Sequence, residues 1–304
     1  MIYTLTLNPA IDRELVVPDI AFDVVLRASS WQVDFGGKGF NVSRLLSGFD
    51  TPSIALGFIG GDSGRILKNG LNSLGIQTDF VCVEGETRTN ISIRSESRSH
   101  YIKANEPGPT ITEKNVQKLL ERIEALASPG DWWVLAGSLP PGCPKDIYKR
   151  IITVVQSQGS KAILDTSGEP LVLGIEAAPY LCKPNLQEAE ALTGGRGKSA
   201  LELASMVREL GPENVVISIG ADGAIFIGKA GSFEVPSPRI EEKNPIGAGD
   251  SMVGGMVWAL EQGFDFLDVV RWGVACGAGT ASLEGTSVAD VQIAQTLLDK
   301  IVVS

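Results

Sequence analysis

Histidine and cysteine are scarce in this chain of 304 residues, and each shortage excludes a kind of chemistry. His100 is the only histidine, so catalytic triads that need histidine and His-rich metal sites are excluded. The 4 cysteines lie far apart and form no Cys-x-x-Cys pair, which argues against a disulfide framework and against a zinc site. If the protein uses a catalytic base, we expect a carboxylate.

Long apolar segments and a basic surplus are also missing. The chain has no run of about eighteen apolar residues, and its N-terminus lacks the basic and apolar parts of an export signal. We therefore expect a cytoplasmic protein with no membrane partner. The 36 acidic residues outnumber the 26 basic ones, for a net charge of −10, so nucleic acid is not expected to bind. An anionic small molecule would need a local group of lysines or arginines.

Glycine is plentiful, and two glycine-rich turns precede apolar residues at helical spacing. In the first, Gly247, Ala248 and Gly249 stand just before Asp250 at the start of a predicted helix. The first amides of a helix lack internal partners and attract anions, and small side chains let a phosphate approach the backbone. A phosphate site beside a carboxylate base suits phosphoryl transfer to an alcohol. Simple helix capping is the alternative interpretation.

The second turn surrounds a lysine with glycines and leads into a helix whose core face is Val42, Leu45 and Leu46. Lys38 could neutralise an anion that approaches the backbone there, and Asn41 could hydrogen-bond a polyol. A tight turn with a solvated lysine is the alternative. The glycine spacing differs from that of a Walker A loop.

Polar residues near predicted strand ends form a third group of candidates. Asp12 follows a buried strand at 2–7, near the sheet edge where parallel sheets bind ligands, and is either a substrate contact or a turn residue. Asn185 and Glu188 share one face of a helix that opens after Pro184. Their oxygens could hold hydrated Mg²⁺, or they could simply cap that helix.

Strands and helices alternate along most of the chain, which predicts a three-layer α/β/α domain with an added β-rich part. Further strands are expected at 52–59, 80–83, 131–136, 161–165, 180–183 and 214–219, with a hairpin at 224–235. Further helices are expected at 62–74, 112–127, 144–156, 264–283 and 287–301. Arg88 lies near the start of a β-rich insert. Its guanidinium either donates hydrogen bonds to a phosphate or belongs to an ordinary surface arginine.

Several stretches of the chain resemble motifs of one known family and occur in the same order. They are Thr6 to Asp12, Gly36 to Val42, Thr87 to Asn90, Gly137 to Pro140, Lys183 to Glu188 and Gly247 to Ser251. Over nearly the whole chain they resemble the PfkB-type carbohydrate kinases, in the phosphosugar branch of 1-phosphofructokinases and tagatose-6-phosphate kinases. The resemblance implies a single ribokinase-like α/β domain over 1–304, with a mainly parallel central sheet and a small β-sheet lid from inserts at about 10–36 and 86–106.

The resemblance also implies an enzyme that uses ATP and Mg²⁺ to convert a ketohexose monophosphate into a 1,6-bisphosphate, as a homodimer formed through the lid. Asp250 is implied as the base, and Gly247, Ala248 and Gly249 as the hole for the transferred phosphoryl group. The implied substrate contacts are Asp12, Arg27, Gly37, Lys38, Asn41, Arg88, Asn90 and Ser138. The implied nucleotide contacts are Lys183, Asn185, Ser218, Gly220 and Gly223. Asn185 and Glu188 are implied to hold Mg²⁺ through water.

Two positions depart from the family pattern, and some questions stay open. Asn244, Pro245 and Ile246 precede the turn at Gly247, where relatives usually have a threonine, and Ser92 stands where they often have lysine. Fructose 1-phosphate, tagatose 6-phosphate and fructose 6-phosphate all remain candidate substrates, and a catalytically silent binding protein on the same fold is the alternative of another class. We also expect the helix N-terminus to keep Asp250 ionised and only weakly basic.

Overall fold

A computed structural model describes residues 1–98 and 100–303, and its largest part is a nine-stranded sheet with the order β13-β12-β11-β10-β9-β8-β1-β4-β5. The strands from β5 to β11 pair in parallel, and β12 and β13 add an antiparallel edge. Their bounds are β1 Ile2–Thr6, β4 Ser53–Gly60, β5 Gln77–Val83, β8 Trp132–Ala136, β9 Lys161–Asp165, β10 Leu181–Cys182, β11 Asn214–Ser218, β12 Ala224–Gly228 and β13 Gly231–Val235.

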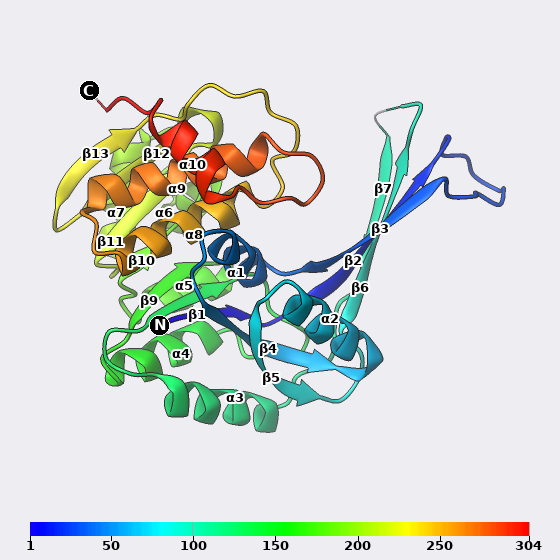
Figure 1. Cartoon of the computed structure of the whole chain (residues 1–304). Coiled ribbons are helices and arrows are strands. Elements are labelled where there is room, and N and C mark those ends of the chain that lie inside the picture. The colour runs from blue at the N-terminus through cyan, green and yellow to red at the C-terminus, as the bar shows by residue number, and fades with distance from the viewer. Residues whose placement is uncertain (99, 304) are drawn as a thin grey trace.

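Helices cover both faces of this sheet (Figure 1). One face carries α1 Lys38–Gly48, α2 Gly61–Ser73, α8 Ala248–Glu261, α9 Phe266–Ala281 and α10 Val291–Leu298. The other carries α3 Glu113–Leu126, α4 Ile147–Ser157, α5 Glu169–Ile175, α6 Leu186–Thr193 and α7 Ala200–Glu209. Strands that are buried on both faces read as continuous apolar runs, and every residue of Trp132–Ala136 is buried. The predicted three-layer α/β/α fold with a mainly parallel sheet is confirmed.

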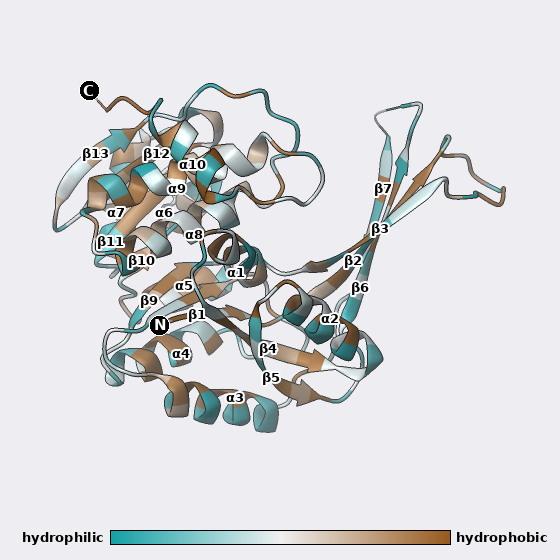
Figure 2. Cartoon of the chain, viewed as in Figure 1, coloured by the Kyte–Doolittle hydropathy of each residue, from teal (hydrophilic) through white to brown (hydrophobic). Residues whose placement is uncertain are grey.

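A second sheet projects from this body as a twisted ribbon (Figure 1). It has the order β3-β2-β6-β7, with β2 Ala10–Val17, β3 Ser30–Gly36, β6 Arg88–Ser95 and β7 Tyr101–Asn105. β2 pairs with β6 in parallel, while the two outer pairs are antiparallel. These strands fall within the two segments for which a lid was predicted, and we call this sheet the lid. Brown and teal residues mix along the lid, whereas the central strands are largely brown (Figure 2).

Two short helices and several element ends were not predicted correctly. α5 and α7 were missed, although Ser199 and Glu202 form a capping box at the start of α7. The predicted strand at 80–83 begins at Gln77, because it extends along β4 as far as that residue. The C-terminal helix is shorter than predicted, since it begins after the Asp290 cap and ends at Leu298. Within the described residues, no helix has both the length and the apolar character of a membrane span.

Candidate active site

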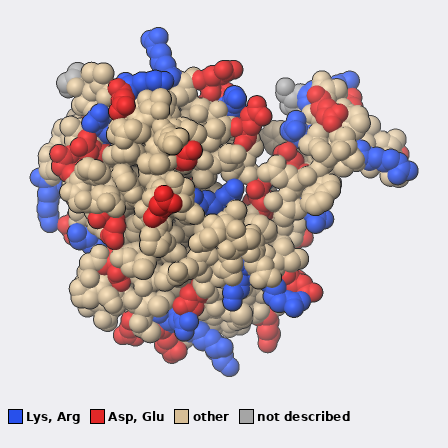
Figure 3. All heavy atoms as spheres, viewed as in Figure 1, with Lys and Arg blue, Asp and Glu red and all other residues tan. Residues whose placement is uncertain are grey.

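The carboxyl ends of the central parallel strands meet at one edge of the sheet, where the first turns of α1 and α8 also lie. The strand register places Thr6, Ala136 and Asp165 side by side at this edge. A cavity of about 190 Å³ opens here. It is lined by Thr6, Asn8, Gly37, Lys38, Arg88, Gly137, Ser138, Thr166 and Ser167. Basic side chains are visible in the hollow between the body and the lid (Figure 3), although the chain is acidic overall.

The first turn of α8 has the geometry of an anion site. Gly247 has φ of +81°, a left-handed conformation that glycine adopts without strain. The amide of Ala248 donates to the carbonyl of Pro245 at 3.2 Å. Among the described residues, the amides of Gly249 and Asp250 have no acceptor, so they are the donors available to a ligand. The predicted phosphate turn therefore presents the amides that follow Ala248 rather than that of Ala248 itself.

Asp250 is 8% exposed, and its carboxyl accepts a hydrogen bond of 2.8 Å from Nδ2 of Asn41. Burial raises its pKa to about 6, and the charge of Asp165 adds to this rise, while Lys38, Asn41 and Lys183 oppose it. The carboxyl is therefore still ionised at neutral pH, as expected, but it is more basic than a helix N-terminus alone would make it. A helix terminus contributes about 0.3–1 kcal/mol, whereas each pKa unit corresponds to about 1.4 kcal/mol, so desolvation outweighs it.

Asp165 is a central residue of the site that the sequence interpretation missed. It ends β9, is 2% exposed, and lies between two lysines. Lys38 Nζ lies 3.4 Å from Asp165 Oδ2, and Lys183 Nζ lies 3.3 Å from Asp165 Oδ1. Burial lowers the pKa of Lys38, but Asp165, Asp250 and Glu188 more than offset this, so the net pKa is raised and Lys38 stays charged. A carboxylate at the carboxyl end of a parallel strand was the available signal, as it was for Asp12.

The base of the lid brings three predicted substrate contacts close to the cavity. Asp12 and Asn90 are register partners on β2 and β6, and Nδ2 of Asn90 donates to Oδ1 of Asp12 at 2.7 Å. Asp12 therefore belongs to the lid rather than to the end of β1. Arg88 lines the cavity, and its Nη2 donates to the carbonyl of Asn8 at 2.9 Å. Burial lowers the pKa of Arg88, although the charge of Asp12 opposes this, and the guanidinium donates to the backbone carbonyls of Asn8 and Glu106.

Arg27 does not lie with the other predicted substrate contacts. It is exposed in the connection between β2 and β3, at the far end of the lid (Figure 1), and it does not line the cavity. Its predicted role as a phosphate partner therefore does not fit the site of its own chain. The remaining contacts, Gly37 and Ser138, line the cavity directly.

The predicted nucleotide residues follow the ends of β10 and β11. Lys183 follows β10. Ser218 is the last residue of β11 and forms an isolated parallel β-bridge with Asn185. Lys183 Nζ would lie 3.8 Å from a Cβ placed on Gly249, so it adjoins the phosphate turn. Gly220 begins an exposed 3₁₀ turn. A Cβ on Gly223 would meet the carbonyl oxygen of Val235 at 2.1 Å, so that glycine serves the packing of the hairpin.

Asn185 and Glu188 form a reciprocal capping box at the start of α6. Oδ1 of Asn185 accepts from the Glu188 amide at 2.8 Å, and Oε2 of Glu188 accepts from the Asn185 amide at 2.9 Å. No cluster of three or more His, Cys, Asp or Glu side chains able to hold a metal occurs within residues 1–98 and 100–303. Glu188 keeps Oε1 outside the capping box. One carboxylate oxygen suits Mg²⁺ that retains most of its waters.

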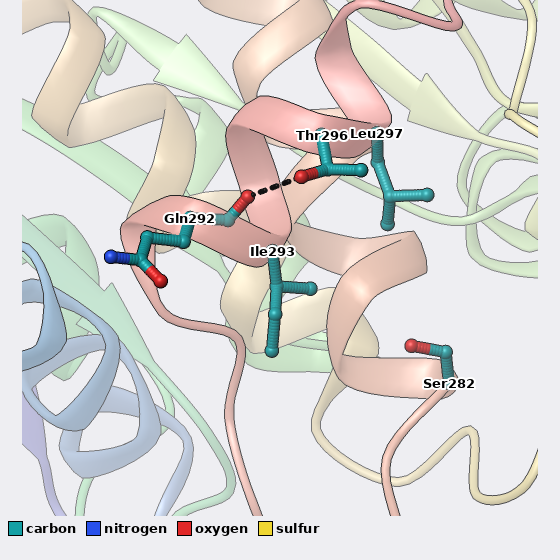
Figure 4. A pocket seen from close by; sticks show the side chains of 5 residues that line it. All are labelled: Ser282, Gln292, Ile293, Thr296 and Leu297. Atoms are coloured by element: carbon teal, nitrogen blue, oxygen red, sulfur yellow. Dashed lines mark hydrogen bonds between the residues drawn. The ribbon is translucent and has the colours of Figure 1, made fainter.

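A second cavity, of about 260 Å³, lies between the end of α9 and α10 (Figure 4). Ser282, Gln292, Ile293, Thr296 and Leu297 line it. None of the predicted site residues is among them. It has no carboxylate or lysine, so we assign it no part in the chemistry at Asp250.

Comparison with known proteins gives consistent results. The model of the pfkB family carbohydrate kinases matches residues 4–292. A 1-phosphofructokinase from Borreliella burgdorferi is 39% identical over 92% of each chain. A D-tagatose-1-phosphate kinase from Bacillus licheniformis is 35% identical over 94% of each chain. The crystal structure of phosphofructokinase-2 from Escherichia coli in complex with potassium has a TM-score of 0.93 at 29% identity, and covers 98% of each chain.

Proposed function

Because the chain belongs to the pfkB family of carbohydrate kinases, we propose that it transfers the γ-phosphoryl group of ATP to the 6-hydroxyl of fructose 1-phosphate, giving fructose 1,6-bisphosphate and ADP. The observation that carries this proposal is the first turn of α8. There the amides of Gly249 and Asp250, which have no acceptor in the described part of the chain, adjoin a buried carboxyl, and Lys183 lies beside them.

Asp250 is proposed to accept the proton of the attacking hydroxyl. With a pKa of about 6 the carboxyl is mostly ionised at neutral pH, yet basic enough to take a proton as the new O–P bond forms. The loose transition state of phosphoryl transfer needs little early deprotonation. Placing the hydroxyl in line with the phosphorus, and neutralising charge, therefore supply most of the rate.

The cations of the site have separate proposed tasks. Lys183 and the α8 amides would stabilise the transferred group, a role supported by their position at the same turn. Lys38 and Arg88 would hold the phosphate already on the sugar, a role supported by their place in the lining of the cavity. Bound Mg²⁺, held through water by Asn185 and Glu188, would neutralise charge on the ATP phosphates.

The choice of a sugar 1-phosphate draws on the relatives. Two of them are named for kinases of ketohexose 1-phosphates, one of fructose and one of tagatose. In both substrates the 6-hydroxyl is free. Tagatose 6-phosphate and fructose 6-phosphate present a free 1-hydroxyl instead, and remain the alternative acceptors within the same family.

An ADP-release assay over fructose 1-phosphate, tagatose 1-phosphate, tagatose 6-phosphate and fructose 6-phosphate tests the proposal. We expect the highest kcat/KM with fructose 1-phosphate. A higher value for another of the four would replace the substrate but keep the kinase. Tight binding of ATP and sugar phosphate without ADP release would instead indicate a silent binding protein.

We also propose that two copies pair through their lids. Trp31 and Tyr101 on the lid strands are 70% and 72% exposed, and Val25 in the connection between β2 and β3 is 85% exposed, which is unusual for large apolar side chains. A second lid is a suitable cover for them. In such a pair Arg27, which does not reach the cavity of its own chain, would be available to a phosphate bound in the other copy.

A further inference from the structure

The first turn of α1 contacts both buried carboxylates of the site. Lys38 and Asn41 stand three positions apart, so their side chains leave the same face of the helix. Lys38 pairs with Asp165, and Asn41 hydrogen-bonds Asp250. The two carboxylates thus have separate partners on one helical turn. Lys38 brings a charge, whereas Asn41 brings only a directional donor.

The hydrogen bond from Asn41 fixes which oxygen of Asp250 is free. An ionised carboxylate only accepts hydrogen bonds, so Asn41 must turn its amide NH₂ toward it. Nδ2 of Asn41 donates to Oδ2 of Asp250 at 2.8 Å, which leaves Oδ1 for another partner. The backbone amide of Asn41 is itself held by the carbonyl of Gly37 at 3.0 Å. The donor is therefore anchored on a different helix from the carboxylate it contacts.

We propose that Asn41 is the positioning residue of the base, and that its amide holds the Asp250 carboxylate so that Oδ1 faces the reacting hydroxyl. This role is additional to any contact of Asn41 with the sugar, and it rests on the proposed function. It also predicts an electrostatic effect that a sugar contact would not have. A hydrogen bond to the charged form of an acid favours ionisation, and so acts against the burial of Asp250.

Burial opposes the ionisation of the Asp250 carboxyl most strongly, and four neighbouring groups also act on it. Asp165 on β9 opposes it, while Lys38 and Asn41 on α1 and Lys183 after β10 favour it. Of these, Asn41 is the only one that can be replaced without changing the net charge near the site. Asn41→Ala is therefore the cleanest variant. Asn41→Asp is the stronger one, because it places a second carboxylate against the first.

The experiment compares wild type, Asn41→Ala, Asn41→Asp and the control Ser47→Ala, which changes an exposed residue of the same helix. The acid limb of kcat is measured at saturating substrates. The Asp250 carboxyl is also titrated by carbon NMR in the protein without substrates, with Asp250→Asn for assignment. The NMR titration needs no activity, so it remains informative if the proposed substrate is wrong.

We expect Asn41→Ala to lower kcat at pH 6 by about tenfold or more and to move both the acid limb and the NMR titration to higher pH by about one unit. Asn41→Asp should move both further, and Ser47→Ala should move neither. A raised KM with an unmoved limb would reduce Asn41 to a sugar contact and overturn the proposal. Lower thermal stability with an unmoved NMR titration would likewise overturn it, because the role would then be structural only.

Discussion

The two sheets of this protein contrast in how they are covered. Every residue of Trp132–Ala136 in the central sheet is buried, whereas every residue of Tyr101–Asn105 in the lid is exposed. The central sheet is enclosed by helices of its own chain, so its edge can hold Asp165 and Asp250 in fixed, dry positions. The lid keeps only its base against the body, where Asp12 and Asn90 meet. This contrast supports the proposal that the chemistry belongs to the body and that the lid serves recognition and association.

The largest expected effect tests whether the body carries the chemistry. Asp250→Asn keeps the shape of the side chain but removes the base, so we expect kcat to fall by about 10²–10⁴-fold, the usual contribution of a general base. ATP binding, measured by calorimetry, should persist. Asp50→Asn, at an exposed position beyond the end of α1, is the control and should keep full turnover. A normal kcat in Asp250→Asn would show that this carboxylate of the body is not the catalytic base.

The difference in burial predicts a difference in stability. Phe226 in β12 is fully buried and stacks on Phe233 and Phe266, so Phe226→Ala should lower the free energy of unfolding by about 3–5 kcal/mol. Lys103→Ala on the exposed β7 should change it by less than about 0.5 kcal/mol. Urea denaturation measures both. Equal losses would mean that the lid is as tightly packed as the body.

The pH dependence of turnover sharpens the description of the body site. The pKa of Asp250 in the protein without ligands is raised to about 6, and the ionised form is the active one, so kcat/KM, which reports the free enzyme, should fall about tenfold per pH unit below that value. The measurement is kcat/KM from pH 4.5 to 8. An acid limb near pH 4, the usual range of an aspartic acid, would show that burial does not set the basicity of Asp250.

The smallest expected effect concerns the lid. Val25→Asp should weaken self-association, seen as a shift toward monomer by sedimentation at micromolar protein, because it places a charge on a proposed apolar contact. Val302→Asp is the matched control, since Val302 is 77% exposed but lies at the C-terminal end of the body. If both variants assemble like wild type, the lid is not the contact between copies.

Local sequence signals located much of the site. The turn from Gly247 to Asp250 was identifiable because a glycine-rich segment directly precedes a helix, so motif and structure lie in one stretch. The pairing of Asn185 with Glu188 was also identifiable, because both residues lie in one short stretch at the start of a helix. The hydrogen bonds show that the two residues cap that helix. The fold class followed from the alternation of strands and helices.

Contacts between distant parts of the chain were not accessible in this way. Asp165 reads as the last residue of an ordinary strand, and its importance comes from two lysines more than ten positions away in either direction. The basicity of Asp250 depends on burial by other elements, which a helix-terminus argument omits. Arg27 has the right chemistry for a phosphate, but the length of the lid carries it away from the cavity of its own chain.

The placement of Asp165 has a thermodynamic consequence for the order in which ligands arrive. Its two oxygens are each within 3.4 Å of a lysine, one on the proposed sugar side and one on the proposed nucleotide side. A bound anion that attracts one of the two lysines weakens the ion pair of that lysine with Asp165. The Asp165 carboxylate then attracts the other lysine more strongly. The affinities of the two substrates are therefore linked, and any such linkage is reciprocal: whatever ATP does to the binding of the sugar, the sugar does equally to the binding of ATP.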